Sequence, residues 1–316
     1  MVPTDIKAED EETVHTSIRA AIYSGYTHID TGFQYQQKKF IGDAISALLK
    51  EGEIGRFELF ITTMLPANGM QPDCVEYFMK KSLAALQTNY VDLYLVHTPI
   101  SSMRSKDDDE YFVVKDDVFQ ADNNVDLVEN WKAMEKLVDK GLTRAIGLSN
   151  YNSEQVKLIY DAARIKPAML QVECHAYLPQ FELFDFCEKL GIAMTAFAPL
   201  GTSGFAEFAK KNPGLDCPHP CLVEDERLKP IAEKYGKTPS QVLLQYLVKR
   251  GIVVIPTPKE NCPHEIQDNI QIFDFSLTKE EYFEIKAMGD EKRRYMKFDH
   301  IKGMTEHPAY PFKIPF

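Results

Sequence analysis

Short apolar runs alternate with longer amphipathic segments along nearly the whole chain, and this alternation limits the folds open to it. Seven runs have the length and composition of buried strands: residues 26–29, 59–62, 91–96, 144–147, 169–172, 192–196 and 252–255. Segments with helical spacing of apolar residues lie between them: 12–24, 39–49, 72–87, 126–140, 153–164, 180–190 and 239–249. Because each helix carries the chain back across the sheet, the strands are expected to run parallel.

Seven strand–helix units are one short of a closed barrel, and the missing first strand is expected from residues 2–6, which contain Pro3. No linker or repeat divides the 316 residues, a length that suits one barrel. The sequence therefore predicts one α/β domain over residues 1–316, a (β/α)8 TIM barrel. Long loops are expected at its mouth, including an exposed one over 101–124, followed by an irregular C-terminal tail over 290–316.

The charge balance narrows the classes of partner. A formal net charge of -11 disfavours binding to nucleic acid, since an acidic surface repels phosphates. Neither a membrane-length apolar stretch nor a signal peptide is evident, so we expect a cytoplasmic protein with no membrane partner. Cys217, His219 and Cys221 have the spacing of half a zinc site, but no second cluster follows, so no metal site is predicted.

Polar side chains follow the predicted strands at the end where TIM barrels carry their active sites. A tyrosine and a histidine there suit a proton donor and the group that orients the carbonyl oxygen, and neighbouring amides suit a carboxamide. Each has a simpler interpretation by itself: Tyr35 as a packing residue, His97 as a core histidine, and Ser149–Asn150 as a helix N-cap. The strand-end residues are Asp30, Tyr35, His97, Ser149, Asn150 and Gln171.

Several segments together resemble the aldo-keto reductase family, and its arthropod members in particular. The matching stretches are residues 25–31 with Tyr35 and Gly42, residues 134–150, 171–175, 199–201 and 307–312. The resemblance covers nearly the whole chain, and the second stretch is long and specific. It implies reduction of aldehyde and ketone carbonyls with NADP(H).

The family's catalytic tetrad of Asp, Tyr, Lys and His falls on Asp30, Tyr35, Met64 and His97, so methionine stands where lysine is expected. A thioether cannot neutralise Asp30, and an unneutralised carboxylate raises the pKa of a nearby phenol. Weak proton donation by Tyr35 is therefore expected. Protonated His97 is the alternative acid at mildly acidic pH.

The resemblance also assigns the cofactor site, with departures. Phe197 replaces a tyrosine that stacks on the nicotinamide, and it can still stack. Glu260 and Glu265 fall where the family grips the 2′-phosphate, which favours NAD(H) or loss of dinucleotide binding. The cofactor-binding residues implied are Ser149, Asn150, Gln171, Phe197, Leu200, Lys259 and Asn269.

Two functions follow from these residues. One is an NAD(P)H-dependent carbonyl reductase impaired by Met64. The other is a non-catalytic binding, storage or structural protein on the same scaffold. In both cases the expected partner is a small carbonyl compound or an apolar ligand, and the expected state is a monomer.

Overall fold

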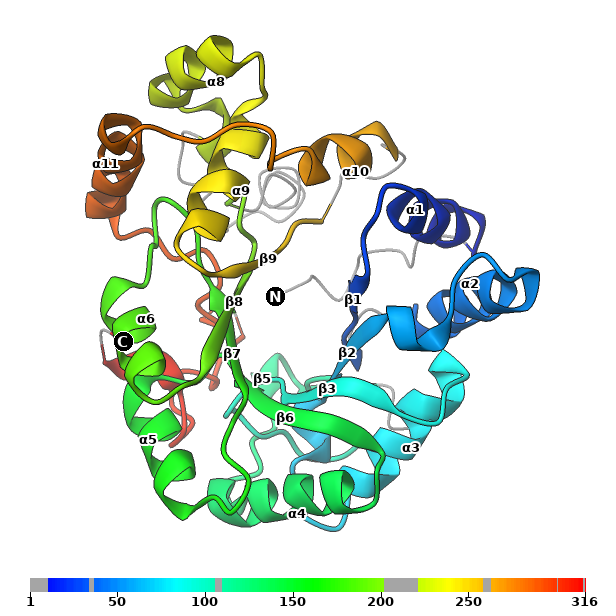
Figure 1. The fold of residues 1–316 in the computed structure, drawn as a ribbon. Coiled ribbons are helices and arrows are strands. Elements are labelled where there is room, and N and C mark those ends of the chain that lie inside the picture. The colour runs from blue at the N-terminus through cyan, green and yellow to red at the C-terminus, as the bar shows by residue number, and fades with distance from the viewer. Residues whose placement is uncertain are drawn as a thin grey trace.

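The computed structural model describes residues 11–33, 37–105, 110–201, 221–257, 263–299, 301–314 and 316. Their main feature is a curved sheet of parallel strands in the order β1-β2-β3-β6-β7-β8-β9, surrounded by helices (Figure 1). The strands are β1 (His28–Asp30), β2 (Phe60–Leu65), β3 (Val91–Val96), β6 (Thr143–Ser149), β7 (Met169–Glu173), β8 (Ala193–Phe197) and β9 (Val253–Ile255).

The helices form an outer ring around this sheet (Figure 1). They are α1 (Glu11–Tyr23), α2 (Lys38–Glu51), α3 (Val75–Leu86), α4 (Leu127–Asp139), α5 (Ser153–Ala162), α6 (Phe181–Lys189), α8 (Lys229–Tyr235), α9 (Pro239–Lys249), α10 (Pro263–Ile270) and α11 (Lys279–Ala287). None of the described helices is long and apolar enough to cross a membrane.

The (β/α)8 barrel class is confirmed, and each of the seven predicted strands is present. Residues 2–6, from which the first strand was expected, lie outside the described residues. Three helices, α8, α10 and α11, were not predicted. Two of them, α8 and α10, have only 7 and 8 residues, too few turns for a clear apolar period.

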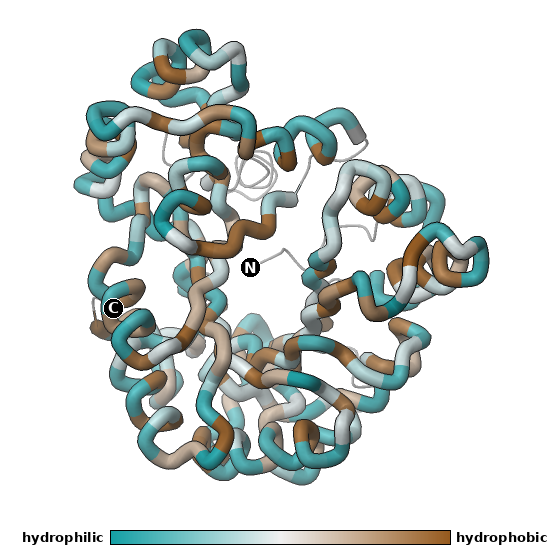
Figure 2. Tube along the Cα trace, viewed as in Figure 1, coloured by the Kyte–Doolittle hydropathy of each residue, from teal (hydrophilic) through white to brown (hydrophobic). Residues whose placement is uncertain are grey.

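The sheet separates two apolar layers. The large layer packs between strands and helices, with fully buried Phe78, Trp131 and Tyr246 among its members. A smaller cluster of Met64, Leu93 and Leu95 joins side chains of two adjacent strands on the other face, inside the barrel. Figure 2 shows hydrophobic residues along the strands and inner helix faces, with hydrophilic residues on the outer turns.

The loop over 101–124 is less exposed than predicted. It contains a short antiparallel hairpin, β4 (Val114–Lys115) and β5 (Val118–Phe119). Phe112 and Phe119 are buried in a separate cluster with Phe298 and Met304 of the tail. The acidic residues of this loop led to the prediction of an exposed segment. Its aromatic side chains are instead buried against apolar side chains of the tail. The described residues of the tail contain no α-helix or strand, as expected for an irregular segment. A 3₁₀ turn, Met288–Glu291, leads into the tail, and a second, Pro311–Lys313, lies near its end.

Candidate active site

Asp30 and Met64 stand on neighbouring strands at the barrel mouth. Asp30 is the last residue of β1 and pairs in register with Thr62 of β2. Met64 lies two residues further along β2, opposite Leu95 of β3. Alternate residues of a strand share a face, so Met64 lies on the same face as Thr62, beside Asp30. Position 64 is therefore where a lysine would meet the Asp30 carboxyl group.

Met64 is instead part of the apolar interior. Its side chain is 1% exposed and packs with Leu93 and Leu95, with Ala145 and Met169 against the same cluster. A thioether suits these neighbours because it has no charge to solvate. The packing offers Asp30 no cation from β2.

Asp30 finds its hydrogen-bond partner across the barrel. The Gln171 side-chain amide on β7 donates to Oδ2 of Asp30 at 2.8 Å. Burial raises the pKa of Asp30 to about 7, and the hydrogen bond from Gln171 opposes this rise only in part. A carboxyl group beside a lysine would be ionised throughout the neutral range, whereas this one is partly protonated there.

His97 directly follows β3, and its ring lies 5.0 Å from the ring of Tyr111. Burial lowers the pKa of His97 to about 3, and the nearby Lys38 ammonium lowers it further. The imidazole is therefore neutral at pH 7 and also at mildly acidic pH. The expectation that protonated His97 serves as the acid under those conditions is wrong, because the buried ring is not solvated well enough to carry charge.

Ser149 and Asn150 join the ends of three strands. Asn150 has a positive φ of 62° and its Nδ2 donates to the His97 carbonyl at 2.9 Å and to Oγ of Ser149 at 3.2 Å. Its backbone N–H donates to the Gln171 carbonyl. The N-cap interpretation is wrong, because Asn152 caps α5, accepting from the N–H of Gln155.

The remaining predicted cofactor residues are more widely spread. Phe197 ends β8 and pairs in register with Glu173 of β7. Leu200 follows three residues later and packs on the main core, and Asn269 is buried on α10. Glu265 lies in the first turn of α10. Tyr35, Lys259 and Glu260 lie outside the described residues.

The described residues contain no group of three or more His, Cys, Asp or Glu side chains that is arranged to hold a metal ion. Cys217 and His219 fall outside them, so the half zinc site seen in the sequence stays untested. The candidate site therefore consists of polar side chains at the barrel mouth together with the aromatic ring of Phe197.

Residues 4–290 match the model of the aldo/keto reductase family. The chain belongs to this family. It is 38% identical to aldo-keto reductase family 1 member A1 of Gallus gallus over 309 residues, covering 96% of this chain and 91% of that protein. It is also 38% identical to prostaglandin F synthase 1 of Bos taurus over 298 residues, 92% of this chain and 86% of that one.

Solved structures agree with this membership. The aldose reductase of Schistosoma japonicum superimposes with a TM-score of 0.86 at 32% identity, covering 98% of this chain and 93% of that chain. The aldose reductase of Giardia lamblia gives 0.82 at 29% identity, with 92% of each chain covered. The barrel thus has the architecture of these reductases.

In this aldo-keto reductase, Glu173 anchors the tail to the barrel. Its fully buried carboxylate accepts from the backbone N–H groups of Tyr295 at 2.7 Å and Met296 at 2.8 Å, and contacts Nε2 of His175 at 3.0 Å. Burial opposes ionisation of Glu173, but these hydrogen bonds and the charges of His175 and Arg294 hold its pKa below the usual value. The signal in the sequence is an acidic residue at the end of the otherwise apolar-rich strand β7.

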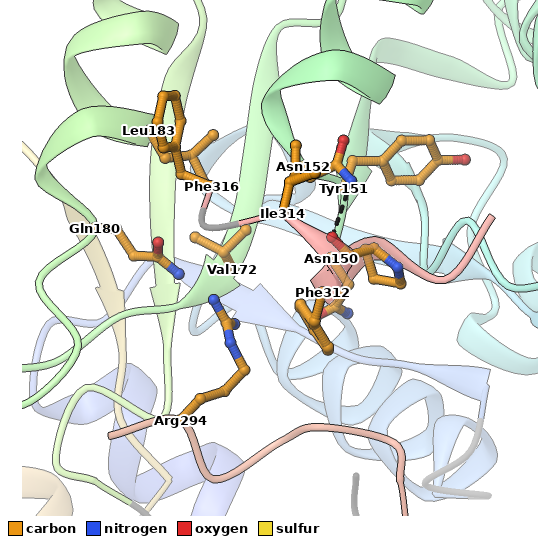
Figure 3. A pocket seen from close by; sticks show the side chains of 11 residues that line it. Asn150, Tyr151, Asn152, Val172, Gln180, Leu183, Arg294, Phe312, Ile314 and Phe316 are labelled. Carbon is orange, nitrogen blue, oxygen red and sulfur yellow. Dashed lines mark hydrogen bonds between the residues drawn. The ribbon is translucent and has the colours of Figure 1, made fainter. Parts of the chain in front are cut away.

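Beside this anchor a small pocket lies between the tail and the ends of β6 and β7 of the reductase fold. Figure 3 shows Arg294 extending toward it from the tail, with Phe312 and Phe316 along its edge. The Asn152 amide donates to the Pro311 carbonyl at 2.8 Å and so holds the tail in place. The pocket adjoins Asn150 of the strand-end group, and the tail forms much of its wall.

Proposed function

We propose that this aldo-keto reductase reduces aldehyde and ketone carbonyls with a nicotinamide dinucleotide, slowly at neutral pH. The observation that carries the proposal is the pairing of Asp30 with the neutral amide of Gln171, while Met64 fills the position beside it. Ser149, Asn150 and Gln171 at the strand ends support a reductase, yet the Asp30 carboxyl group has no ion-pair partner among the described residues.

The residues present fit a nicotinamide ring. Ser149, Asn150 and Gln171 are buried polar groups on adjoining strands, and Ser149 pairs in register with Gln171. Such amides and hydroxyls can hold a carboxamide by donating and accepting, and the flat ring of Phe197 can stack on the nicotinamide. When bound, the dinucleotide supplies the hydride.

Proton delivery is the step that the chain performs poorly in this proposal. The expected donor is Tyr35, which becomes negative when it gives up its proton. An ionised Asp30 opposes that charge, and a protonated Asp30 does not. His97 is neutral and serves to orient the carbonyl oxygen rather than to protonate it.

Support for NADP(H) comes from the family, which generally uses it. Support for NAD(H) comes from Glu265, a carboxylate in the first turn of α10. The family resemblance predicts that this turn binds the 2′-phosphate of NADP(H). A carboxylate repels a 2′-phosphate and accepts a hydrogen bond from a 2′-hydroxyl. We propose that NADH loses less affinity here than NADPH, relative to other family members.

A non-catalytic role is the second candidate, favoured by one observation. The side-chain amides of Gln171 and Asn150 both donate within the protein, to Asp30 and to the His97 carbonyl. A dinucleotide has to compete with these partners. On this alternative the barrel binds a small apolar or carbonyl compound without turning it over.

Dinucleotide binding and aldehyde turnover, measured on the same protein, distinguish the reductase from the non-catalytic alternative. Trp131 is buried in α4 and donates to the Ile165 carbonyl on the helix side of the sheet, so calorimetry is a better probe than tryptophan quenching. We expect NADH or NADPH to bind, with slow reduction of a simple aldehyde at pH 7. No binding of either dinucleotide rejects the reductase proposal, and fast turnover rejects the impairment.

The remaining assignments are proposals of the same kind. The family resemblance supports a monomer that binds small molecules. The acidic charge and the lack of a membrane-length apolar stretch in the sequence support a cytoplasmic protein with neither nucleic acid nor membrane as partner. Size-exclusion chromatography with light scattering tests the monomer.

A further inference from the structure

We propose that the side-chain amide of Gln171 leaves Asp30 and donates to the nicotinamide carboxamide when a dinucleotide binds. Asp30 then takes up a proton. This change of partner is called the exchange below. This inference rests on the proposed function, because it requires a dinucleotide at the barrel mouth. It adds a coupling between cofactor affinity and pH that follows from the replacement of an ion pair by a neutral amide.

The hydrogen bond between Asp30 and Gln171 lies where the nicotinamide ring is expected to bind. Asp30 is on β1 and Gln171 on β7, and β2, β3 and β6 separate them in the sheet. Their 2.8 Å hydrogen bond therefore crosses the barrel mouth instead of joining neighbouring strands. A nicotinamide whose carboxamide oxygen accepts from Nε2 of Gln171 draws that nitrogen away from Asp30.

Among the described residues, no side chain other than Gln171 donates to the Asp30 carboxyl group. Met64 and Leu95 beside it are apolar, so the Asp30 carboxyl group depends on the Gln171 amide in the described part of the chain. The titratable groups near the interior on the surrounding elements are His28 on β1, His97 after β3, Glu173 at the end of β7 and Lys38 at the start of α2.

Of these four groups, Lys38 titrates in the same pH range as Asp30. Burial lowers the pKa of His28 to about 4, so it is neutral at pH 7 like His97. The Glu173 carboxylate is held by the tail amides. Lys38 donates to Oγ of Ser82 at 2.7 Å, and burial lowers its pKa to about 7, so the comparison with Asp30→Asn separates protons bound at Asp30 from protons bound at Lys38. Strands β2, β6, β8 and β9 carry no charged side chain at the mouth.

The sign of the coupling follows from the hydrogen bond. An N–H donated to a carboxylate favours the ionised form, so withdrawing the Gln171 amide raises the pKa of Asp30. The bound state then holds more protons than the free state between the free pKa, which is about 7, and the higher pKa of the bound state. Linkage requires affinity to fall as pH rises through that range, by up to about tenfold per pH unit.

The test is calorimetric titration with NADH at pH 6 to 9 in buffers of different ionisation enthalpy, which reports the protons taken up. NADH is chosen because it lacks a 2′-phosphate that titrates by itself. We expect uptake of a fraction of one proton, greatest just above pH 7, and its loss in Asp30→Asn. Asp161→Asn, an exposed carboxyl on α5 paired with Lys157, is the matched control and should keep the uptake.

A second measurement follows Asp30 without any cofactor. The infrared carbonyl stretch of a protonated carboxyl group, assigned by difference against Asp30→Asn, gives its titration midpoint. Gln171→Leu should raise that midpoint, and a midpoint that does not move overturns the exchange. NADH binding without proton uptake, or with uptake that survives in Asp30→Asn, overturns the exchange alone. Absence of NADH binding at every pH overturns the exchange and the use of NADH; if NADPH also fails to bind, the proposed function is rejected too.

Discussion

The carboxyl group of Asp30 and the side-chain amide of Gln171 are joined by a 2.8 Å hydrogen bond although three strands separate β1 from β7. Two residues that the family resemblance assigns to different tasks, proton delivery and cofactor binding, thus contact each other directly. Because Met64 brings no charge to Asp30, the amide becomes its partner, and the two tasks are expected to depend on each other.

Met64→Lys should increase carbonyl reduction at pH 7 by about tenfold or more, provided a dinucleotide binds. The new ammonium would stand beside Asp30, neutralise it and make Tyr35 a better acid. Steady-state kinetics with a simple aldehyde measures this. Met64→Leu keeps the apolar packing and is the control, expected to leave the rate low. No gain in the lysine variant, with binding intact, would favour the non-catalytic alternative.

Asp30→Asn should stabilise the fold at pH 8, by about 2–4 kcal/mol, and have little effect near pH 4. The pKa of Asp30 in the folded state is raised to about 7. Ionised Asp30 therefore lowers the free energy of unfolding as pH rises from the pKa of the unfolded state to about 7, and the loss stays constant above that pH. Urea unfolding at both pH values gives the difference between the variant and the unmodified protein. Equal effects at the two pH values would show that Asp30 titrates normally.

Glu265→Arg should shift cofactor preference toward NADPH, because an arginine in the first turn of α10 attracts a 2′-phosphate that the carboxylate repels. The ratio of NADPH to NADH dissociation constants measures it and should fall by about tenfold. The same change at Glu182, exposed on α6, serves as control for added charge. A strong NADPH preference in the unmodified protein would contradict the assignment of Glu265.

Glu173→Gln should loosen the tail without unfolding the barrel. The backbone N–H groups of Tyr295 and Met296 would lose a charged acceptor, and such hydrogen bonds contribute about 1.5–3 kcal/mol. Hydrogen exchange at these two amides is expected to accelerate by about tenfold or more. Glu182→Gln, at an exposed position of α6, should leave the exchange unchanged. Protection that persists in the Glu173 variant would mean that the hydrophobic cluster alone holds the tail.

The tail shows where sequence patterns stop being informative. Phe298 and Met304 have no periodic spacing, so nothing local indicates that they cover Phe112 and Phe119 of the loop after β3. Likewise Glu173 stands out in an apolar strand, but its partners are backbone amides more than a hundred residues later. Contacts between segments far apart in the sequence do not affect the local spacing of apolar residues, so that spacing cannot predict them.

The sequence alone determined the barrel class, the seven strands and the positions of Asp30, Met64, His97 and Gln171 at their ends. Alternation of apolar and polar residues is a local property, and a parallel sheet places all strand ends on one side. Only the tertiary structure decided which of these groups touch. Protonation depends on burial and on neighbours from other strands, so the neutral His97 and the Asp30–Gln171 pair emerged only when the strands were brought together.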